Sequence, residues 1–261
     1  MSETPAAVPI RDLEPAPAAA PPAVARLPMP RWFAMLQAFL VCGIPTQLFI
    51  AVVLIVGARM EPFAGGDVSL EFFAILSFLD TALIAMLIYV FLQMSGETSR
   101  DVFFGQRSIR REVWLGLKLV PAVFLAVITL VIALRTIFPS LHNVETSPLE
   151  AFLVNPIDAA IFLVVVVLAG GIREELQRGF ILHRFDRHLG GVKLGLALFS
   201  ITFGLLHLDQ GYDVAIVIGL LGLLWGVLYV TRRSVVAPMV NHAAFNAAQV
   251  LQAVTVRMLG L

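Results

Sequence analysis

Apolar segments long enough to form membrane-spanning helices recur along this chain, and they constrain its fold more than any other feature. An α-helix needs about 20 apolar residues to cross the hydrocarbon core of a bilayer. Only 14% of the residues are charged, against 59% that are hydrophobic, which is too little charge to coat a soluble globule of 261 residues. The sequence therefore predicts an all-α, polytopic transmembrane helical bundle of about seven spans, or eight helices in total. The expected spans are 32–56, 70–94, 113–138, a fourth that begins at 156, 194–208, 214–230 and 235–256.

Composition divides the chain into three parts. Residues 1–30 hold eight of the fifteen prolines and many alanines, which predicts a disordered cytoplasmic tail. Residues 31–146 carry spans one to three, which are expected to pack the bundle, although the carboxylate of Asp80 stands inside the second span without an evident partner. Residues 147–261 carry spans four to seven and nearly all the polar residues that need an explanation.

Basic residues alternate between the loops, which sets the expected orientation. Lys and Arg gather in the tail, after span two, between spans four and five and after span six, whereas the intervening loops carry few. Because cytoplasmic loops hold an excess of basic residues, we expect an integral, multi-pass membrane protein with its N-terminus in the cytoplasm and its C-terminus outside. The 18 basic and 18 acidic residues balance, so nucleic acid is not an expected partner. The lipid bilayer is the expected partner of the apolar spans. The single Cys42 excludes an intrachain disulfide and is expected to be a buried, inert thiol.

Local signals define the start of the fourth span. Ser147-Pro-Leu-Glu150 has the pattern of a capping box, and Asn155-Pro156 offers a second helix start with proline at its first position. The residue before a proline avoids α geometry. We therefore expect a short helix, a break near Asn155 and a new helix from Pro156.

The fourth span also carries the densest group of ionisable residues, in the stretch GGIREELQRGFILHRFDRHL over 170–189. The sixteen residues from Ile157 to Ile172 give about 24 Å of helix, short of the roughly 30 Å of hydrocarbon, so the helix must run on past Glu174 and Glu175. Intramembrane carboxylates are costly and indicate a functional site by default. Glu174 and Arg178 stand four residues apart on a helix, so we expect these two to pair.

Two histidines of later spans are expected at the same depth as these carboxylates. Glu175 lies fifteen residues before the turn at Gly190, and His207 lies sixteen after Gly191, so antiparallel helices place them level. His242 lies nine residues, or about 13 Å of helix, beyond the turn after span six, and Asn246 shares its helical face. The remaining polar groups, His142, His183, His188, Asp209, Gln210 and Asp213, are expected to be solvated, with Gln210 close enough to orient His207.

Two chemistries suit this set of side chains. A glutamate can take a proton from water while histidine and asparagine donate hydrogen bonds to the developing oxyanion. Alternatively, Glu175, His207 and His242 form the ligand set of a catalytic Zn²⁺ ion with an open position for water. Serine hydrolysis is disfavoured because the chain has no GxSxG motif, and HExxH is absent too.

The three motifs together resemble the CAAX protease and bacteriocin-processing (CPBP) family of intramembrane metalloproteases. They are Glu174-Glu175 with Arg178, FGLLH ending at His207, and HAAFN from His242 to Asn246, and the similarity covers about 152–252. The resemblance implies a helical bundle around a membrane-embedded site that cleaves peptide bonds of membrane-anchored peptide or protein substrates, prenylated CAAX ends in eukaryotic members.

Carried over residue by residue, the resemblance gives each side chain a role. It implies that Glu174 or Glu175 is the water-activating base, assisted by His207, that His242 and Asn246 stabilise the oxyanion, and that Arg178 holds a glutamate in place. The family's usual first motif is EExxxR, whereas here only two residues separate Glu175 from Arg178. Removing one residue rotates a helix by about 100°, so either glutamate can be the base, and a bulge at the Gly170-Gly171 pair would restore the geometry.

The sequence thus predicts an intramembrane endopeptidase. Two other functions fit the same residues. A proton- or ion-coupled transporter would use the buried ionisable groups as a relay. A catalytically inactive membrane scaffold would suit the shortened first motif.

Overall fold

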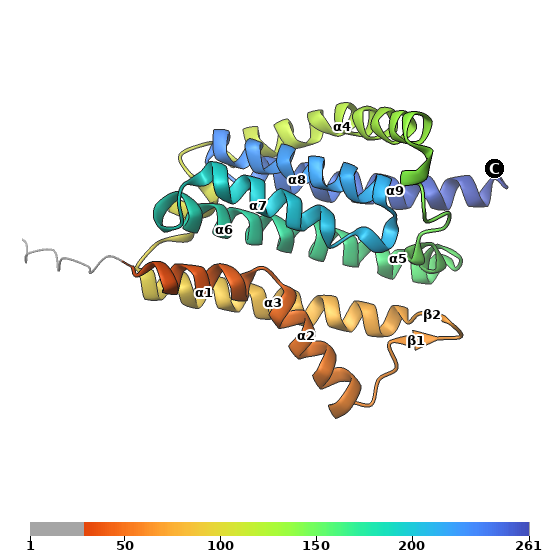
Figure 1. The fold of residues 1–261 in the computed structure, drawn as a ribbon, viewed down its shortest axis with the longest axis horizontal. Coiled ribbons are helices and arrows are strands. Elements are labelled where there is room, and N and C mark those ends of the chain that lie inside the picture. Colours follow the sequence, from red (N-terminus) through yellow and green to blue (C-terminus); the bar gives the residue numbers. More distant parts are fainter. Residues whose placement is uncertain (1–28, 261) are drawn as a thin grey trace, which may run out of the picture.

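The computed structural model describes residues 29–260, so nearly all of the tail predicted over 1–30 lies outside the described residues. The described chain is an all-α bundle, as the sequence predicted (Figure 1). Its α-helices are α1 (Arg31–Val41), α2 (Ile44–Val52), α3 (Leu70–Ser95), α4 (Ile109–Ile137), α5 (Pro156–Val165), α6 (Glu174–His188), α7 (Val192–Leu205), α8 (Tyr212–Arg232) and α9 (Val236–Met258). The two strands, β1 (Phe63–Ala64) and β2 (Asp67–Val68), form a small antiparallel hairpin between α2 and α3.

The count of about seven spans is not confirmed. Within residues 29–260, four helices are long and apolar enough to cross a membrane, or five if the bent pair α1 and α2 is one span. The four are α3, α4, α8 and the continuous helix Pro156–His188, whereas α7 has only 14 residues. Large apolar side chains such as those of Leu48, Phe49 and Val52 are exposed on the surface, as expected for helices that face lipid.

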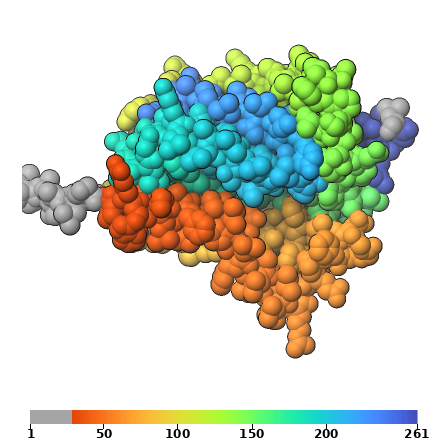
Figure 2. All heavy atoms as spheres, in the orientation of Figure 1, coloured from red at the N-terminus to blue at the C-terminus, as the bar shows by residue number. Residues whose placement is uncertain are grey.

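A break separates α1 from α2. The two helices meet at an angle of 52°, and Gly43 between them has φ +92°, a conformation that favours glycine. Pro45 lies two residues after Gly43, in the first turn of α2, where its missing N–H is tolerated. Beyond the break, α2 and the hairpin project from the body of the molecule (Figures 1 and 2).

The predicted start of the fourth span is confirmed. The capping box is present, with the Ser147 side chain and Glu150 closing the N-terminus of a short 3₁₀ helix, Pro148–Leu153. The side-chain oxygen of Asn155 then accepts a hydrogen bond from the N–H of Ile157 and caps α5. From Pro156 the helix runs without interruption to His188 and so carries both glutamates of the first motif past the apolar run.

A π-helical segment, Val166–Arg173, joins α5 to α6 and contains the bulge expected at Gly170-Gly171. The two glycines let α9 approach this segment closely. A Cβ at Gly171 would lie 2.4 Å from the Cβ of Ala243, and one at Gly170 would lie 2.6 Å from Nδ2 of Asn246. A π-bulge of this kind is frequent at functional sites, because it shifts the side chains that follow it around the helix.

The core gathers around α6. Phe180, Leu182 and Val41 are fully buried there, together with Ile84 of α3. The C-terminal helices pack in pairs, α7 against α8 and α4 against α9, and α9 also packs along the π-helical segment. This packing brings the motifs on α6, α7 and α9 to one region of the bundle.

Candidate active site

A cavity of about 1140 Å³ lies between the helices and is lined mainly by apolar side chains. Four of the six predicted site residues contribute to its wall: Glu174, His207, His242 and Asn246. Glu175 and Arg178 lie behind the wall and are almost completely buried. Side chains that are up to 72 residues apart in the sequence therefore share one polar site.

Glu175 holds His242 from behind. Oε1 of Glu175 lies 2.8 Å from Nδ1 of His242, and Nη1 of Arg178 donates to the same oxygen. Because a carboxylate only accepts hydrogen bonds, Nδ1 carries the hydrogen and Nε2 of His242 is the nitrogen left for other partners. The predicted pairing of Arg178 with Glu174 is wrong: Arg178 pairs with Glu175, three residues earlier, which is also a neighbour on a helix.

Aromatic rings surround the buried guanidinium of Arg178. Its Cζ lies 5.0 Å from the ring centroid of Phe199, 4.9 Å from that of Phe203 and 5.5 Å from that of Trp225. A buried ion pair offsets its desolvation only when other contacts compensate. The cation–π contacts contribute to this compensation, whereas Nε and Nη2 of Arg178 are buried without a hydrogen-bond partner. Arg178 is thus a fixed charge that holds Glu175.

Trp225 also fixes the plane of the His242 ring. The two rings stack with centroids 3.7 Å apart and planes 17° apart. Nε1 of Trp225 donates to Oδ1 of Asn241, at 2.8 Å, so the indole is itself anchored to α9. The imidazole therefore has a hydrogen bond on its edge and a ring on its face, which leaves it little freedom to rotate.

Glu174 is the glutamate of the first motif that faces the cavity. Its side chain is 18% exposed, against 1% for Glu175. Nη2 of Arg173 lies 3.4 Å from its Oε1, and Nε2 of His242 lies 3.9 Å from its Oε2. The second distance is too long for a direct hydrogen bond, and it allows one water molecule to contact both atoms.

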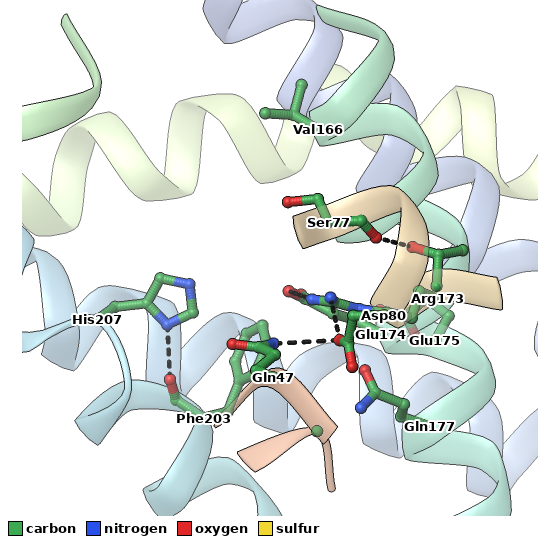
Figure 3. A network of polar contacts seen from close by, with 12 residues as sticks. Gln47, Ser77, Asp80, Val166, Arg173, Glu174, Glu175, Gln177, Phe203 and His207 are labelled. Atoms are coloured by element: carbon green, nitrogen blue, oxygen red, sulfur yellow. Dashed lines mark hydrogen bonds and ion pairs between the residues drawn. The ribbon is translucent and has the colours of Figure 1, made fainter. Parts of the chain in front are cut away.

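His207 faces the same cavity from the end of α7 (Figure 3). Its Nδ1 lies 2.7 Å from the carbonyl oxygen of Phe203, one turn earlier. Since a carbonyl accepts, Nδ1 donates this hydrogen bond and Nε2 is the nitrogen that remains. The backbone of Phe203 therefore orients His207, and the side chain of Gln210, which was expected to do so, is not its partner.

Asn246 is held by the π-helical segment. Its Nδ2 donates to the carbonyl oxygen of Val166 at 3.3 Å. An amide nitrogen carries two hydrogens, so one donor remains for a ligand in the cavity. The π-helical segment thus positions two site residues, because it precedes Glu174 directly and binds Asn246.

The arrangement does not fit the zinc set predicted as the second chemistry. Among residues 29–260, no three His, Cys, Asp or Glu side chains are placed to hold a metal ion. Nδ1 of His242 and Oε1 of Glu175 are also bound to each other. The reaction proposed for this site therefore uses side chains and water.

The sequence reasoning missed the residues that link the N-terminal helices to the site. Asp80 of α3 is fully buried and lies 2.6 Å from Nη1 of Arg173, the residue before Glu174. Thr46 and Gln47 of α2 donate to the same carboxylate, the latter visible in Figure 3. The signal was present, because an unpaired carboxylate within an apolar span requires a partner, but the partner lies 93 residues away.

Three side chains predicted to be solvated are instead partly or fully buried in ion pairs at the ends of the bundle. Asp213 is fully buried, with its Oδ2 2.7 Å from Nε of Arg135 and 3.2 Å from Nδ1 of His142. Nε2 of His183 lies 2.6 Å from Oε1 of Glu97. The physical reason is the same in each case: an oppositely charged or polar group on another segment packs over a residue that sequence position alone places at a helix end.

Glu97 binds both His183 and Arg184. Burial raises its pKa, but the hydrogen bond from His183 and the positive charge of Arg184 outweigh burial and lower the pKa to about 2. Nη1 of Arg184 lies 2.6 Å from Oε2 of Glu97. The pair joins the loop that follows α3 to α6.

Residues 156–248 match the family model described as type II CAAX prenyl endopeptidase Rce1-like. The matched segment runs from the first residue of α5 into α9 and includes all six predicted site residues. No curated protein and no solved structure matches the chain. The family supports a peptidase, and the apolar helices support a protein embedded in the membrane. The chain is therefore similar, over residues 156–248, to the CAAX-type intramembrane proteases, and the resemblance to the CPBP family read from its motifs is confirmed.

Proposed function

We propose that this protein is an intramembrane endopeptidase that cleaves a peptide bond of a membrane-anchored substrate, with Glu174 as the general base. One observation carries the choice between the two glutamates. Glu174 lines the cavity, whereas Glu175 is buried and already neutralised by Arg178 and bound to His242. A base must reach the water that it deprotonates, and only Glu174 does so.

The reacting water would bridge Glu174 and His242. Their facing atoms, Oε2 and Nε2, are 3.9 Å apart, so a water placed between them can hydrogen-bond to both. Glu174 takes a proton as the water oxygen bonds to the carbonyl carbon of the peptide. The protonated Glu174 then gives this proton to the leaving nitrogen as the C–N bond breaks, which restores the carboxylate.

A donor on another wall of the cavity can stabilise the oxyanion that forms. Asn246 has one free hydrogen on Nδ2 for this role, whereas Nε2 of His207 carries no hydrogen when Nδ1 donates to Phe203, so it can instead accept a hydrogen bond from the reacting water. A preorganised donor such as Asn246 typically contributes 10²–10³-fold to the rate. Hydrogen bonds to the backbone hold both side chains in place before substrate arrives, so little reorganisation is needed in the transition state.

The test is cleavage of a farnesylated CAAX peptide, labelled with a fluorophore and a quencher, by purified protein in liposomes. Glu174→Gln keeps the size of the side chain and removes the base, so the rate should fall about 10²–10⁴-fold. Glu71→Gln is the matched control, because Glu71 is exposed at the start of α3 and does not line the cavity. Cleavage by Glu174→Gln at the rate of Glu71→Gln would refute the assignment of the base, and a wild type that cleaves nothing would refute the proteolytic function.

A further inference from the structure

The buried carboxylate of Asp80 has three polar partners on two other segments. Oγ1 of Thr46 lies 2.5 Å from its Oδ1, while Nε2 of Gln47 and Nη1 of Arg173 lie 3.3 and 2.6 Å from its Oδ2. The same hydroxyl oxygen of Thr46 lies 3.0 Å from the carbonyl oxygen of Gly43, at the break between α1 and α2. Asp80 is thus held from α2 and in turn holds Arg173.

Arg173 connects this anchor to the cavity. One terminal nitrogen of its guanidinium, Nη1, binds Asp80, and the other, Nη2, lies 3.4 Å from Oε1 of Glu174. A guanidinium is planar and presents its nitrogens in a fixed fork, so the position of one carboxylate determines where the other is bound. The Glu174 oxygen that faces Arg173 is the one opposite to the oxygen that faces His242.

We propose that Asp80 and Arg173 are positioning residues that fix the Glu174 carboxylate at the wall of the cavity. This inference rests on the proposed function of Glu174. Asp80 weakens the attraction between Arg173 and Glu174, because one cation is shared between two carboxylates. Without Asp80, the whole guanidinium is free to bind Glu174, which would turn the carboxylate away from His242 and the water site.

The proposal gives spans one to three a role beyond packing. The chain of contacts runs from α2 through Asp80 of α3 and Arg173 to Glu174, and it crosses the boundary between the N-terminal helices and the segment 156–248 that matches the family model. It also explains why a carboxylate is tolerated in the middle of α3. A buried aspartate with one ion pair and two hydrogen bonds is satisfied, whereas an unpaired one would be strongly destabilising.

The experiment compares Asp80→Asn, Arg173→Lys, Arg173→Met and the double variant Asp80→Asn/Arg173→Met. Cleavage of the farnesylated CAAX probe gives kcat and KM per folded protein, and thermal unfolding gives Tm. Asp80→Asn should lower kcat by about 10²-fold, the effect of misplacing a catalytic group by about 1 Å, and leave KM unchanged because Asp80 does not line the cavity. Arg173→Lys should lose a similar factor, since a single ammonium cannot bind both carboxylates in a fixed geometry.

The double variant separates positioning from stability. Removing both charges leaves no unpaired buried ion, so its Tm should recover most of the loss seen in the single variants. Its kcat should stay low, because nothing then orients Glu174. A purely structural role predicts instead that kcat recovers together with Tm.

The pair Glu97 and Arg184 supplies the matched control. It also involves a buried arginine of α6, which binds the loop that follows α3 with a nitrogen–oxygen distance of 2.6 Å, but it has no contact with Glu174. Glu97→Gln and Arg184→Met should lower Tm without changing kcat per folded protein. Wild-type kcat in Asp80→Asn or in Arg173→Lys would overturn the positioning role and leave the proposed function intact. A wild type that cleaves no probe would overturn both the positioning role and the proposed function. A Tm of the double variant that differs from the sum of the single effects would then show only that Asp80 and Arg173 form a structural pair.

Discussion

Gly171→Ala should lower the cleavage rate by moving α9. A methyl group at position 171 would lie 2.4 Å from the Cβ and 2.6 Å from the Cα of Ala243, and both glycine and alanine lie on helices that cannot yield by rotating a side chain. Carbon atoms in contact stay about 3.5–4.0 Å apart, so the two segments must separate by about 1 Å or more. His242 precedes Ala243 directly, so a shift of Ala243 would also move His242.

The size of the effect follows from this displacement. A shift of about 1 Å at a catalytic group costs roughly 10²-fold in rate, and overpacking of a core contact costs about 1–3 kcal/mol of stability. Gly171→Ala should therefore cleave the farnesylated CAAX probe about 10²-fold more slowly, and its Tm should fall. The measurement is kcat per folded protein together with thermal unfolding in the same liposomes or detergent.

Gly57→Ala is the matched control for this change. Gly57 ends another π-helical segment, Val53–Gly57, and a Cβ there would meet only Cγ1 of Val53 at 4.0 Å. This variant should keep the wild-type kcat. Equal rates for Gly171→Ala and Gly57→Ala would refute the claim that the close approach of α9 to the π-helical segment sets the geometry of the site.

Three further predictions concern other parts of the molecule. Trp225→Phe removes the hydrogen bond to Asn241 and part of the stack on His242, so kcat should fall about tenfold. An unchanged kcat would mean that the stack does not hold the imidazole. Because Glu97 titrates at about 2 in the folded protein, below its usual value of 4.5, its contribution to stability is present above pH 4.5 and is lost as the pH falls toward 2. The difference in Tm between wild type and Glu97→Gln should accordingly shrink over that range, and a constant difference would contradict the ion pair. Treatment with a zinc chelator such as 1,10-phenanthroline should leave the cleavage rate unchanged, because the described side chains are not arranged as a three-ligand site. A loss of activity that added Zn²⁺ reverses would contradict this prediction.

Local features of the fold could be predicted from the sequence because short-range rules determine them. The capping box at Ser147, the helix start at Asn155 and the all-α class each depend on residues within a few positions of one another or on average composition. A bulge at the glycine pair was one way to restore the geometry of the first motif, and the structure has a π-helical segment there.

Long-range pairing could not be predicted in the same way. The depth of a residue follows from counting along a helix, but its partner depends on how far each helix is rotated about its axis. Counting placed Glu174 and Glu175 together, and only the packing shows that Glu175 turns toward Arg178 and His242 while Glu174 faces the cavity. Asp80 shows the same limit, because its need for a partner was evident but nothing local identified Arg173.

The most direct test of the account is cleavage of the farnesylated CAAX probe in ¹⁸O-labelled water under single-turnover conditions. If Glu174 activates a water molecule, the new carboxylate of the wild-type product should carry one ¹⁸O atom, and Glu174→Gln should yield almost no product in the same time. Mass spectrometry of the product measures both. A first-turnover product without ¹⁸O, or labelled product formed by Glu174→Gln at the wild-type rate, would contradict the central claim.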